Sequence, residues 1–182
     1  MPYSSPPALE FRSVDKRFAL SIVNGHVREL LRHCEKAGVR ETGGTLIGHY
    51  TDGLDCAVVT RVCGPEEDSR AGATWFERGT KTLRALLDEY WRRGRGYYLG
   101  EWHFHPGAAP TPSGPDRRAM RRIALDPGSQ CRQPVLLIVG GDSTCWSASA
   151  HVFPARADPV ELLQLPTGLY PGLAPASLSQ EP

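Results

Sequence analysis

The most informative stretch of the sequence is GEWHFHPGAAPTPSGPD, residues 100–116. It follows a run typical of a central strand, residues 97–104, and His103 and His105 lie two residues apart at the end of that strand. Because side chains alternate along a strand, both imidazoles point to the same face of the sheet. Two ligands on one rigid strand suit a metal ion, although a His-x-His pair alone does not establish a metal site.

Asp116 supplies the third ligand in this prediction. It lies in the first turn of a helix predicted over residues 115–125, where Pro115 loses nothing by lacking an N–H group. Ser113 and Asp116 also form a Ser-x-x-Asp arrangement that caps a helix start, and taken alone Asp116 is better explained as such a cap. The two roles are compatible, because the cap holds the carboxylate in place.

Two imidazoles and one carboxylate form a ligand set for zinc, with one Zn²⁺ per chain. Three protein ligands leave the fourth position to water, which is the arrangement of catalytic zinc sites. A hydrolase of this kind also needs a carboxylate that moves protons and is not a ligand. Glu41 is the candidate, because it immediately precedes a strand and the pair Gly43 and Gly44, where a backbone or a substrate tail can approach closely.

The spacing of apolar residues around this stretch predicts a mixed α/β fold. Helical spacing predicts helices from about residue 25 to 38 and from about residue 83 to 94. Alternating or compact apolar runs predict two strands within residues 9–22, on either side of a turn near Asp15, and further strands at 45–50, 56–62, 74–76, 135–139 and 144–153. We therefore expect one α/β domain in which a mixed, mainly antiparallel sheet is flanked by helices on both faces.

Three segments are expected along the chain. Residues 1–24 form N-terminal strands or a hairpin, residues 25–153 form the main domain, and residues 154–182 form a tail rich in Pro, Gly and Ser. We expect that tail to be either disordered or an irregular wrap on the surface.

Composition excludes several classes of function. The chain has 182 residues and a net charge of +1, from 21 basic and 20 acidic residues, so neither nucleic acid nor an anionic membrane is an expected partner. No apolar run is long enough to cross a bilayer and the N-terminus does not resemble a signal peptide, so we expect a cytoplasmic protein. The five cysteines form no CxxC pair and are expected to be free thiols rather than disulfides or zinc ligands.

The segments ETGGTLIG (residues 41–48) and HFHP (residues 103–106), together with Ser113 and Asp116, resemble the JAMM metalloproteases, also called JAB or MPN-plus. The family pattern is an upstream Glu, then His-x-His-Pro, a Ser eight residues on and an Asp three after that. The resemblance covers roughly residues 25–153 and implies a single JAB/MPN domain with the layering of cytidine deaminases. It implies that Glu41 is the general acid/base and that Ser113 stabilises an oxyanion. It also implies that the remaining three residues bind zinc: His103, His105 and Asp116. Phe104 departs from the Ser or Thr of many members, but it points away from the histidines.

Members of this family cut isopeptide or peptide bonds after the C-terminal glycine of ubiquitin or a ubiquitin-like protein. The segments GPEEDS (residues 64–69) and WFERG (residues 75–79) resemble the bacterial JAB proteins. Those are encoded beside homologues of ubiquitin-activating and ubiquitin-conjugating enzymes, often in antiviral defence operons. The resemblance implies a deubiquitinase-like isopeptidase or precursor-processing peptidase, with a ubiquitin-like protein or its conjugate as substrate. Two alternatives stay open, a JAMM peptidase acting on a sulfur-carrier ubiquitin-like protein and a catalytically silent MPN scaffold.

Three further features carry predictions of their own. Glu101 shares a face with His103, so it either orients that histidine or is simply solvated. Four arginines of the third predicted helix form a basic stripe that is either solvated or contacts an acidic partner: Arg117, Arg118, Arg121 and Arg122. The polar loop over residues 64–73 is expected to order over an incoming substrate tail by strand pairing.

Overall fold

A hairpin and an amphipathic helix begin the described part of the chain, which in this computed structural model comprises residues 7–53, 55–72, 76–77, 79, 81–94, 96–166 and 173–175. The strands β1 (Pro7–Arg12) and β2 (Ala19–Val23) are antiparallel, and the turn predicted near Asp15 joins them. Helix α1 (Asn24–Ala37) buries the four residues whose spacing predicted it: Val27, Leu30, Leu31 and Cys34. It ends at Gly38, whose φ of 64° lies in the left-handed region that glycine adopts readily.

Most of the remaining elements follow the predicted order. They are β3 (Thr42–Tyr50), β4 (Cys56–Val62), β5 (Arg70–Ala71), β6 (Phe76–Glu77), α2 (Leu83–Arg92), β7 (Tyr97–Pro106), α3 (Gly114–Leu125), β8 (Val135–Asp142) and β9 (Cys145–Val152). Strand β3 begins three residues before the predicted start at residue 45, which brings its first residue next to Glu41. Of the strand predicted at residues 74–76, only residue 76 lies within the described residues, in β6.

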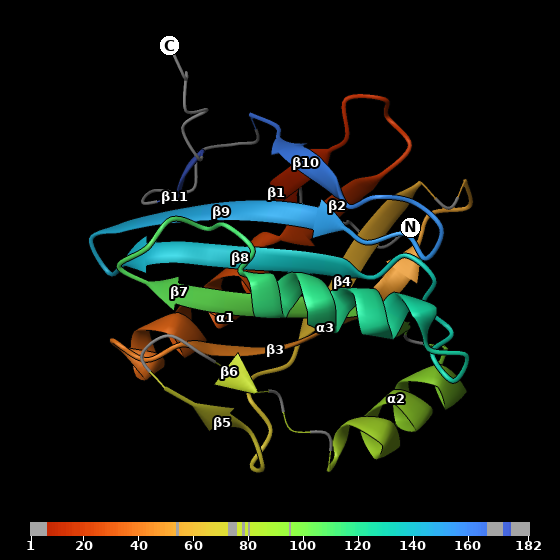
Figure 1. Ribbon diagram of the computed structural model, residues 1–182, viewed down its shortest axis with the longest axis horizontal. Helices are drawn as coiled ribbons and strands as arrows, with labels where there is room; N and C mark the ends of the chain where they lie inside the picture. Colours follow the sequence, from red (N-terminus) through yellow and green to blue (C-terminus); the bar gives the residue numbers. More distant parts are fainter. Residues whose placement is uncertain are drawn as a thin grey trace.

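The sheet is not simply a layer flanked by helices, as we expected, because the strands close into a barrel (Figure 1). Neighbouring strands follow the order β10-β1-β2-β4-β3-β7-β8-β9, and β9 pairs again with β10 (Val160–Gln164), which makes a ring of eight. The layered, flanked sheet of cytidine deaminases is therefore not an adequate description. The expectation of a mainly antiparallel sheet holds, since only β2–β4, β7–β8 and β9–β11 (β11, Leu173–Pro175) are parallel among the described pairs.

The closing strand comes from the segment that we expected to be irregular. Strand β10 pairs with both β1 and β9, but only Leu162 of its five residues is buried. One buried residue gives too little alternation to predict a strand, so its formation depends on the two free edges that it joins. The division of the chain at residues 24 and 153 stays a prediction.

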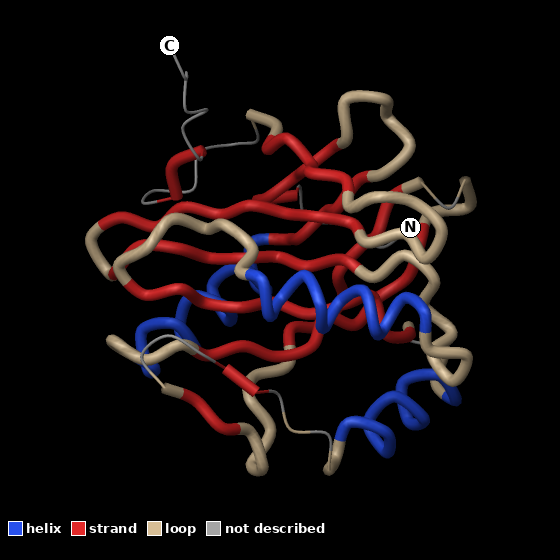
Figure 2. The backbone as a smooth tube through the Cα atoms, viewed as in Figure 1, coloured by secondary structure: helices blue, strands red, loops and turns tan. Residues whose placement is uncertain are grey.

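Two apolar clusters lie on opposite faces of the strands that carry the histidines. One cluster joins α1 to the strand faces that bear Trp102 and Phe104, which we call the α1 face. The other, between α3 and β8, consists of four residues and marks the α3 face: Met120, Leu136, Ile138 and Phe153. The tube drawing shows α3 lying along the outside of these strands (Figure 2). Since Trp102 and Phe104 point to the α1 face, His103 and His105 point to the α3 face.

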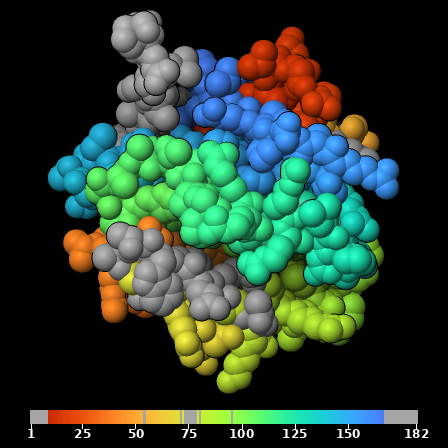
Figure 3. Space-filling model, viewed as in Figure 1, coloured from red at the N-terminus to blue at the C-terminus, as the bar shows by residue number. Residues whose placement is uncertain are grey.

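The exposed side of α3 carries the predicted basic stripe. Its four arginines are exposed: Arg117, Arg118, Arg121 and Arg122. In the space-filling view, α3 (green to teal) lies at the surface of the molecule (Figure 3). Contact with an acidic partner stays a prediction. None of the three described helices combines the length and the apolar composition that a bilayer-spanning helix needs.

Candidate metal centre and active site

Pairing between β3 and β7 brings Glu41 beside the histidine pair. Gly43 lies opposite His103, and Thr42 lies opposite Phe104. The next residue of the antiparallel register, Glu41, therefore reaches the level of His105, with its side chain on the same face as the imidazoles. These groups lie more than sixty residues apart in the sequence, and the antiparallel pairing of β3 with β7 brings them together in space.

A helix cap brings Ser113 and Asp116 to the same place. Ser113 is the N-cap of α3, where its Oγ accepts a hydrogen bond from the backbone N–H of Asp116 at 3.2 Å. The backbone N–H of Ser113 donates in return to Oδ2 of Asp116 at 2.7 Å. This is the reciprocal capping box that the Ser-x-x-Asp spacing predicted. It satisfies two N–H groups of the first turn and fixes the carboxylate.

Three potential ligands converge in this region. One ligand atom from each of His103, His105 and Asp116 lies within 4.8 Å of the other two, and all three side chains are buried. Nδ1 of His103 is 2.9 Å from Oδ1 of Asp116, and Nε2 of His105 is 3.6 Å from Oδ2 of the same carboxylate. Ligands about 2.0–2.2 Å from a tetrahedral zinc ion are roughly 3.4 Å apart, so these spacings and donor types fit zinc.

The family of prokaryotic homologs of the JAB domain matches residues 23–149 of the chain. The chain belongs to this family. The match spans the histidine pair, Glu41 and the capping box, and it confirms the resemblance inferred from the spacing of those residues.

The JAB relatives carry names from peptidase chemistry. A protein of Enterobacter hormaechei subsp. hoffmannii named CD-NTase/cGAS isopeptidase is 42% identical over 85% of this chain and 86% of its own length. A protein of Sinorhizobium fredii named probable metalloprotease y4qB is 29% identical over 69% of this chain and 78% of its own length. The solution structure of protein DSY2949 from Desulfitobacterium hafniense, 18% identical, covers 88% of this chain and 95% of its own with a TM-score of 0.59, which supports the fold alone. The family and the metalloprotease name together imply a metal.

Charges in the JAB domain's cluster are strongly coupled. Burial by itself would lower the pKa of His103, but hydrogen bonds with Asp116 and Glu101 raise that pKa above its usual value. Burial would raise the pKa of Asp116, but its contacts with His103 and with the cap lower it. Burial lowers the pKa of His105. The cluster thus favours one ionised carboxylate and one neutral imidazole, and both of these are forms that bind a metal.

Glu41 is half-buried beside the cluster rather than part of it. Burial, and then the negative charge of Asp116, raise the pKa of its carboxyl. Its backbone N–H donates to the carbonyl of Gly72 at 2.9 Å, which ties it to the end of the polar loop that follows β4. A carboxylate with a raised pKa, held next to the ligands, suits a group that exchanges protons with a substrate.

The glycine pair after Glu41 serves the protein's own packing at Gly44. A Cβ atom at this position would lie 2.0 Å from the carbonyl oxygen of Cys63 and 2.9 Å from Nε1 of Trp102. That indole N–H donates to the same carbonyl at 2.8 Å. Either a backbone or a substrate tail was expected to approach this glycine pair; at Gly44 the group is the backbone at the end of β4.

Glu101 contacts His103 on the side away from Asp116. Its Oε2 is 3.3 Å from Nε2 of His103, and its Oε1 accepts a hydrogen bond from the hydroxyl of Tyr98 at 3.4 Å. Nδ1 of His103 is therefore turned towards the ligand cluster and Nε2 towards a carboxylate. Of the two predictions for Glu101, contact with the histidine is the one that the structure supports, since this side chain is only 4% exposed.

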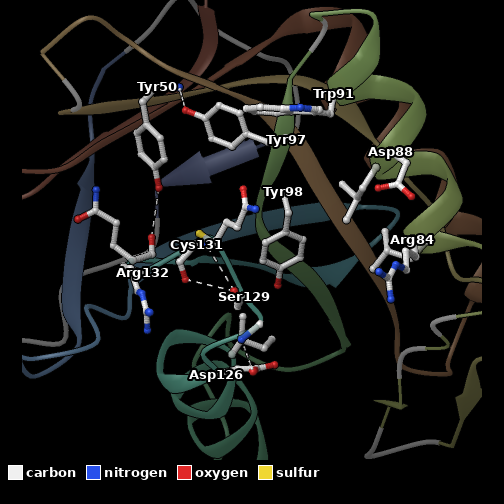
Figure 4. A pocket seen from close by; sticks show the side chains of 16 residues that line it. Tyr50, Arg84, Asp88, Trp91, Tyr97, Tyr98, Asp126, Ser129, Cys131 and Arg132 are labelled. Carbon is white, nitrogen blue, oxygen red and sulfur yellow. Dashed lines mark hydrogen bonds between the residues drawn. The ribbon is translucent and has the colours of Figure 1, made fainter.

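A separate groove opens between α2, the start of β7 and the loop after α3 (Figure 4). It has a volume of about 1150 Å³, and four aromatic side chains line it: Tyr50, Trp91, Tyr97 and Tyr98. The hydroxyl of Tyr97 accepts a hydrogen bond from the backbone N–H of Tyr50 at 2.9 Å. None of the five predicted site residues lines this groove, so the chemistry is expected elsewhere, at the ligand cluster.

Proposed function

We propose that this JAB-family protein is a zinc-dependent isopeptidase. The observation that carries the proposal is the convergence of His103, His105 and Asp116, with ligand atoms within 4.8 Å of one another. A protein named isopeptidase that is 42% identical over most of both chains supports the same reaction class. A catalytically silent scaffold would not need to keep a complete ligand set with a half-buried carboxylate beside it, so that alternative is less well supported.

One zinc ion per chain is proposed to bind to these three residues. Bound there, zinc would supply Lewis acidity, which lowers the pKa of water to about 7 and polarises a carbonyl group. Nδ1 of His103 and Nε2 of His105 are the nitrogen atoms that face Asp116, and they are the proposed ligand atoms.

Glu41 is proposed to move the protons of the hydrolysis. A water molecule adds to the carbonyl carbon of the isopeptide bond, and Glu41 takes one proton from that water. When the C–N bond breaks, Glu41 returns the proton to the leaving lysine amine, and the products are a carboxylate and an amine. Burial and the charge of Asp116 raise the pKa of Glu41. This helps both proton transfers, because the pKa of a general acid–base group works best near the operating pH.

Ser113 is proposed to stabilise the oxyanion while it caps α3. Its Oγ accepts a hydrogen bond from the backbone of Asp116, and a hydroxyl that accepts still has its own hydrogen to donate. That hydrogen is suited to the charge that develops on the carbonyl oxygen. The cap thus holds the hydroxyl in one orientation without using the donor.

The substrate is proposed to be a protein joined through its carboxyl terminus to a lysine. The names of three relatives point to a CD-NTase or cGAS as the joined protein. A ubiquitin-like protein, deconjugated or processed from a precursor, was the first expectation from the sequence and is now the second candidate; a sulfur-carrier ubiquitin-like protein is the third. Homologues of activating and conjugating enzymes encoded nearby, and a cytoplasmic location, stay predictions.

The substrate tail is proposed to bind as an added strand beside the loop over residues 64–73, of which residues 64–72 lie in the described part of the chain. The end of this loop forms β5, and the carbonyl of Gly72 accepts a hydrogen bond from Glu41. An extended tail paired with this segment would pass directly beside the proton-moving group. Main-chain pairing demands little of the side chains, so selectivity would arise where the last residue meets the buried ligand cluster.

The direct test uses two conjugates and a chelator. In the first conjugate a CD-NTase is joined through its C-terminal carboxyl to a lysine of a reporter, and in the second a ubiquitin-like protein ending in glycine is joined in the same way. We expect zinc-loaded protein to release at least one of them, with activity lost to a chelator and restored by added zinc. A version of the second conjugate with leucine in place of the terminal glycine should be cut at least about tenfold more slowly, since one added side chain can cost about 1–3 kcal/mol in a fitted site. Failure of folded, zinc-loaded protein to cut either conjugate would favour the scaffold alternative.

Replacing Ser113 by Ala separates its two roles. We expect kcat to fall by an amount equal to at most about 4 kcal/mol in the barrier, the upper range for loss of one oxyanion donor. The free energy of unfolding should fall by about 1 kcal/mol because the cap is lost. Ser113→Thr keeps the hydroxyl and should preserve both properties. Unchanged kinetics with lower stability in Ser113→Ala would leave Ser113 only its capping role.

Replacing Glu101 by Ala should weaken zinc binding by about 10–100-fold, the usual effect of removing a group that orients a ligand histidine. The physical reason is that Nε2 of His103 would lose its buried carboxylate partner, 3.3 Å away. Glu101→Gln keeps an oxygen at this position and should lose less zinc affinity. The measurement is zinc affinity by competition with a chromogenic chelator, and an unaltered Kd in Glu101→Ala would show that the contact does not orient the ligand.

A further inference from the structure

The segment between His105 and Asp116 decides how the two halves of the ligand cluster meet. Residues 107–113 form neither helix nor strand; Ser113 is the last of them, and Asp116 lies in the first turn of α3, which follows. Figure 1 shows this segment as the green loop that crosses β8 and β9 at one end of the barrel before α3 begins. A loop without internal regular structure keeps a fixed path only if other elements hold it.

Strand β8 holds the first half of this segment through backbone contacts. The N–H of Gly107 donates to the carbonyl of Gly141 at 2.8 Å, and the N–H of Gly141 donates to the carbonyl of Ala108 at 3.0 Å. A Cβ atom at Gly140 would lie 2.4 Å from the carbonyl oxygen of Ala108 and 2.7 Å from the nitrogen of Pro110. Gly140 therefore allows the loop to lie directly on the strand.

Two buried polar side chains of β9 hold the second half. The hydroxyl of Ser149 donates to the carbonyl of Pro110, and Oγ of the same residue is 3.1 Å from Nε2 of His151. Ser149 is 8% exposed and His151 is 7% exposed. A hydroxyl has one hydrogen, and here the carbonyl receives it, so the Ser149 oxygen accepts from the Nε2–H of His151. The direction of both bonds is thereby assigned, from ring to hydroxyl to loop carbonyl.

His151 is neutral in this arrangement. Burial, and then the positive charge of Arg117, lower the pKa of His151 to about 4. A neutral ring carries one N–H, and the contact with Ser149 places it on Nε2. A buried histidine and a buried hydroxyl cost free energy unless they form hydrogen bonds. Here the two side chains bond to each other, and the hydroxyl hydrogen is donated to the loop rather than to a group of the barrel.

We propose that His151 and Ser149 are positioning residues that hold the Pro110 carbonyl and thereby fix Ser113 and Asp116 opposite the histidine pair. This inference rests on the proposed function for its consequence, zinc binding and hydrolysis. Their hydrogen bonds run to each other and to the Pro110 carbonyl, so they act on the ligands through the loop. The expected effect of losing either one is a displaced cap and carboxylate in a protein that is otherwise folded.

The test compares four variants with the wild-type protein. Ser149→Ala removes the hydroxyl, His151→Leu removes the ring donor, and His151→Gln keeps an N–H donor near the position of Nε2. The matched control is Val152→Ala, because Val152 is a buried residue of the same strand that faces the α1 cluster instead of the loop. Three quantities are measured: zinc Kd, kcat and KM on the conjugate, and backbone amide exchange of Ser113 and Asp116 in the zinc-free protein.

We expect Ser149→Ala and His151→Leu to raise the zinc Kd and to lower kcat about tenfold each, the lower end of the range for groups that orient ligands. KM should stay within about twofold, and amide exchange at Asp116 should become on the order of tenfold faster because the local structure opens more easily. His151→Gln should recover most of these losses. Val152→Ala should lower the melting temperature and leave the zinc Kd and the exchange at Asp116 unchanged.

Several results would overturn the inference. One is a folded Ser149→Ala protein whose zinc Kd and amide exchange at Asp116 match those of the wild type. Another is a change in these two quantities in Val152→Ala that equals the change in Ser149→Ala. If Ser149→Ala does not fold, the comparison of His151→Leu with His151→Gln takes its place. Equal losses of zinc affinity and kcat in these two variants would show that the N–H donor of residue 151 does not hold the loop. If the wild-type protein binds no zinc, the proposed function fails by itself. Exchange at Asp116 then still tests the positioning role, which unchanged exchange would refute.

Discussion

Replacing Glu41 by Gln is expected to lower kcat by at least about 100-fold while zinc binding and folding stay intact. Removal of a general acid–base group typically costs 10²–10⁴-fold, and the amide of Gln can neither take the proton of water nor return one to the amine. Glu41 lies beside the ligand cluster and is not among the three residues whose ligand atoms converge. The loss should therefore appear in the chemical step rather than in the metal content.

The experiment measures kcat on the conjugate together with zinc content and thermal unfolding. Glu35→Gln is the matched control, because Glu35 is an exposed carboxylate of α1, and its removal should leave kcat unchanged. Glu41→Asp should recover only part of the activity, since the shorter side chain holds its carboxylate farther from the ligands. Near-normal turnover by Glu41→Gln would mean that another group moves the proton.

Replacing Asp116 by Asn should remove both bound zinc and activity. The neutral amide is a poor ligand for zinc, and loss of the metal removes several kcal/mol of charge stabilisation from the transition state. At 1.36 kcal/mol for each factor of ten, kcat should fall roughly 10³-fold or more. Elemental analysis should find about one zinc per wild-type chain and almost none in the variant.

Asn is chosen over Ala because Asp116 has two tasks. Its Oδ2 accepts the backbone N–H of Ser113 at 2.7 Å, and the amide oxygen of Asn can accept the same hydrogen bond. The variant should therefore keep most of its stability, which distinguishes loss of metal from loss of the helix cap. Ser113→Ala gives the complementary case, since it weakens the cap and keeps all three ligands. Full zinc occupancy in folded Asp116→Asn would contradict the proposed ligand set.

Local spacing alone predicted much of the candidate site. The two-residue spacing of His103 and His105 is sufficient to put both imidazoles on one face of β7, because alternation is a property of the strand itself. The Ser-x-x-Asp spacing is sufficient for the capping box, because both hydrogen bonds are made within one turn of α3. Neither outcome depends on where the rest of the chain lies. The same holds for α1, whose buried residues follow helical spacing.

Other features depend on contacts between distant segments. Strand β10 closes the barrel although only Leu162 of its residues is buried, because its pairing is decided by the free edges of β1 and β9. Gly44 lacks a side chain because the backbone of Cys63 lies against it. The contact of His151 with Ser149 and, through it, with Pro110 exists only when the loop lies across β9.

The sequence by itself determined the direction of side chains within each element and the family to which those spacings belong. The tertiary structure decided which elements meet: the closed barrel, the approach of Glu41 to the histidine pair and the anchoring of the loop before Ser113. The physical reason is the range of the interactions. Alternation, helical periodicity and capping are fixed by backbone geometry over a few residues, whereas strand pairing and loop packing depend on the free energy of contacts between residues far apart in the chain.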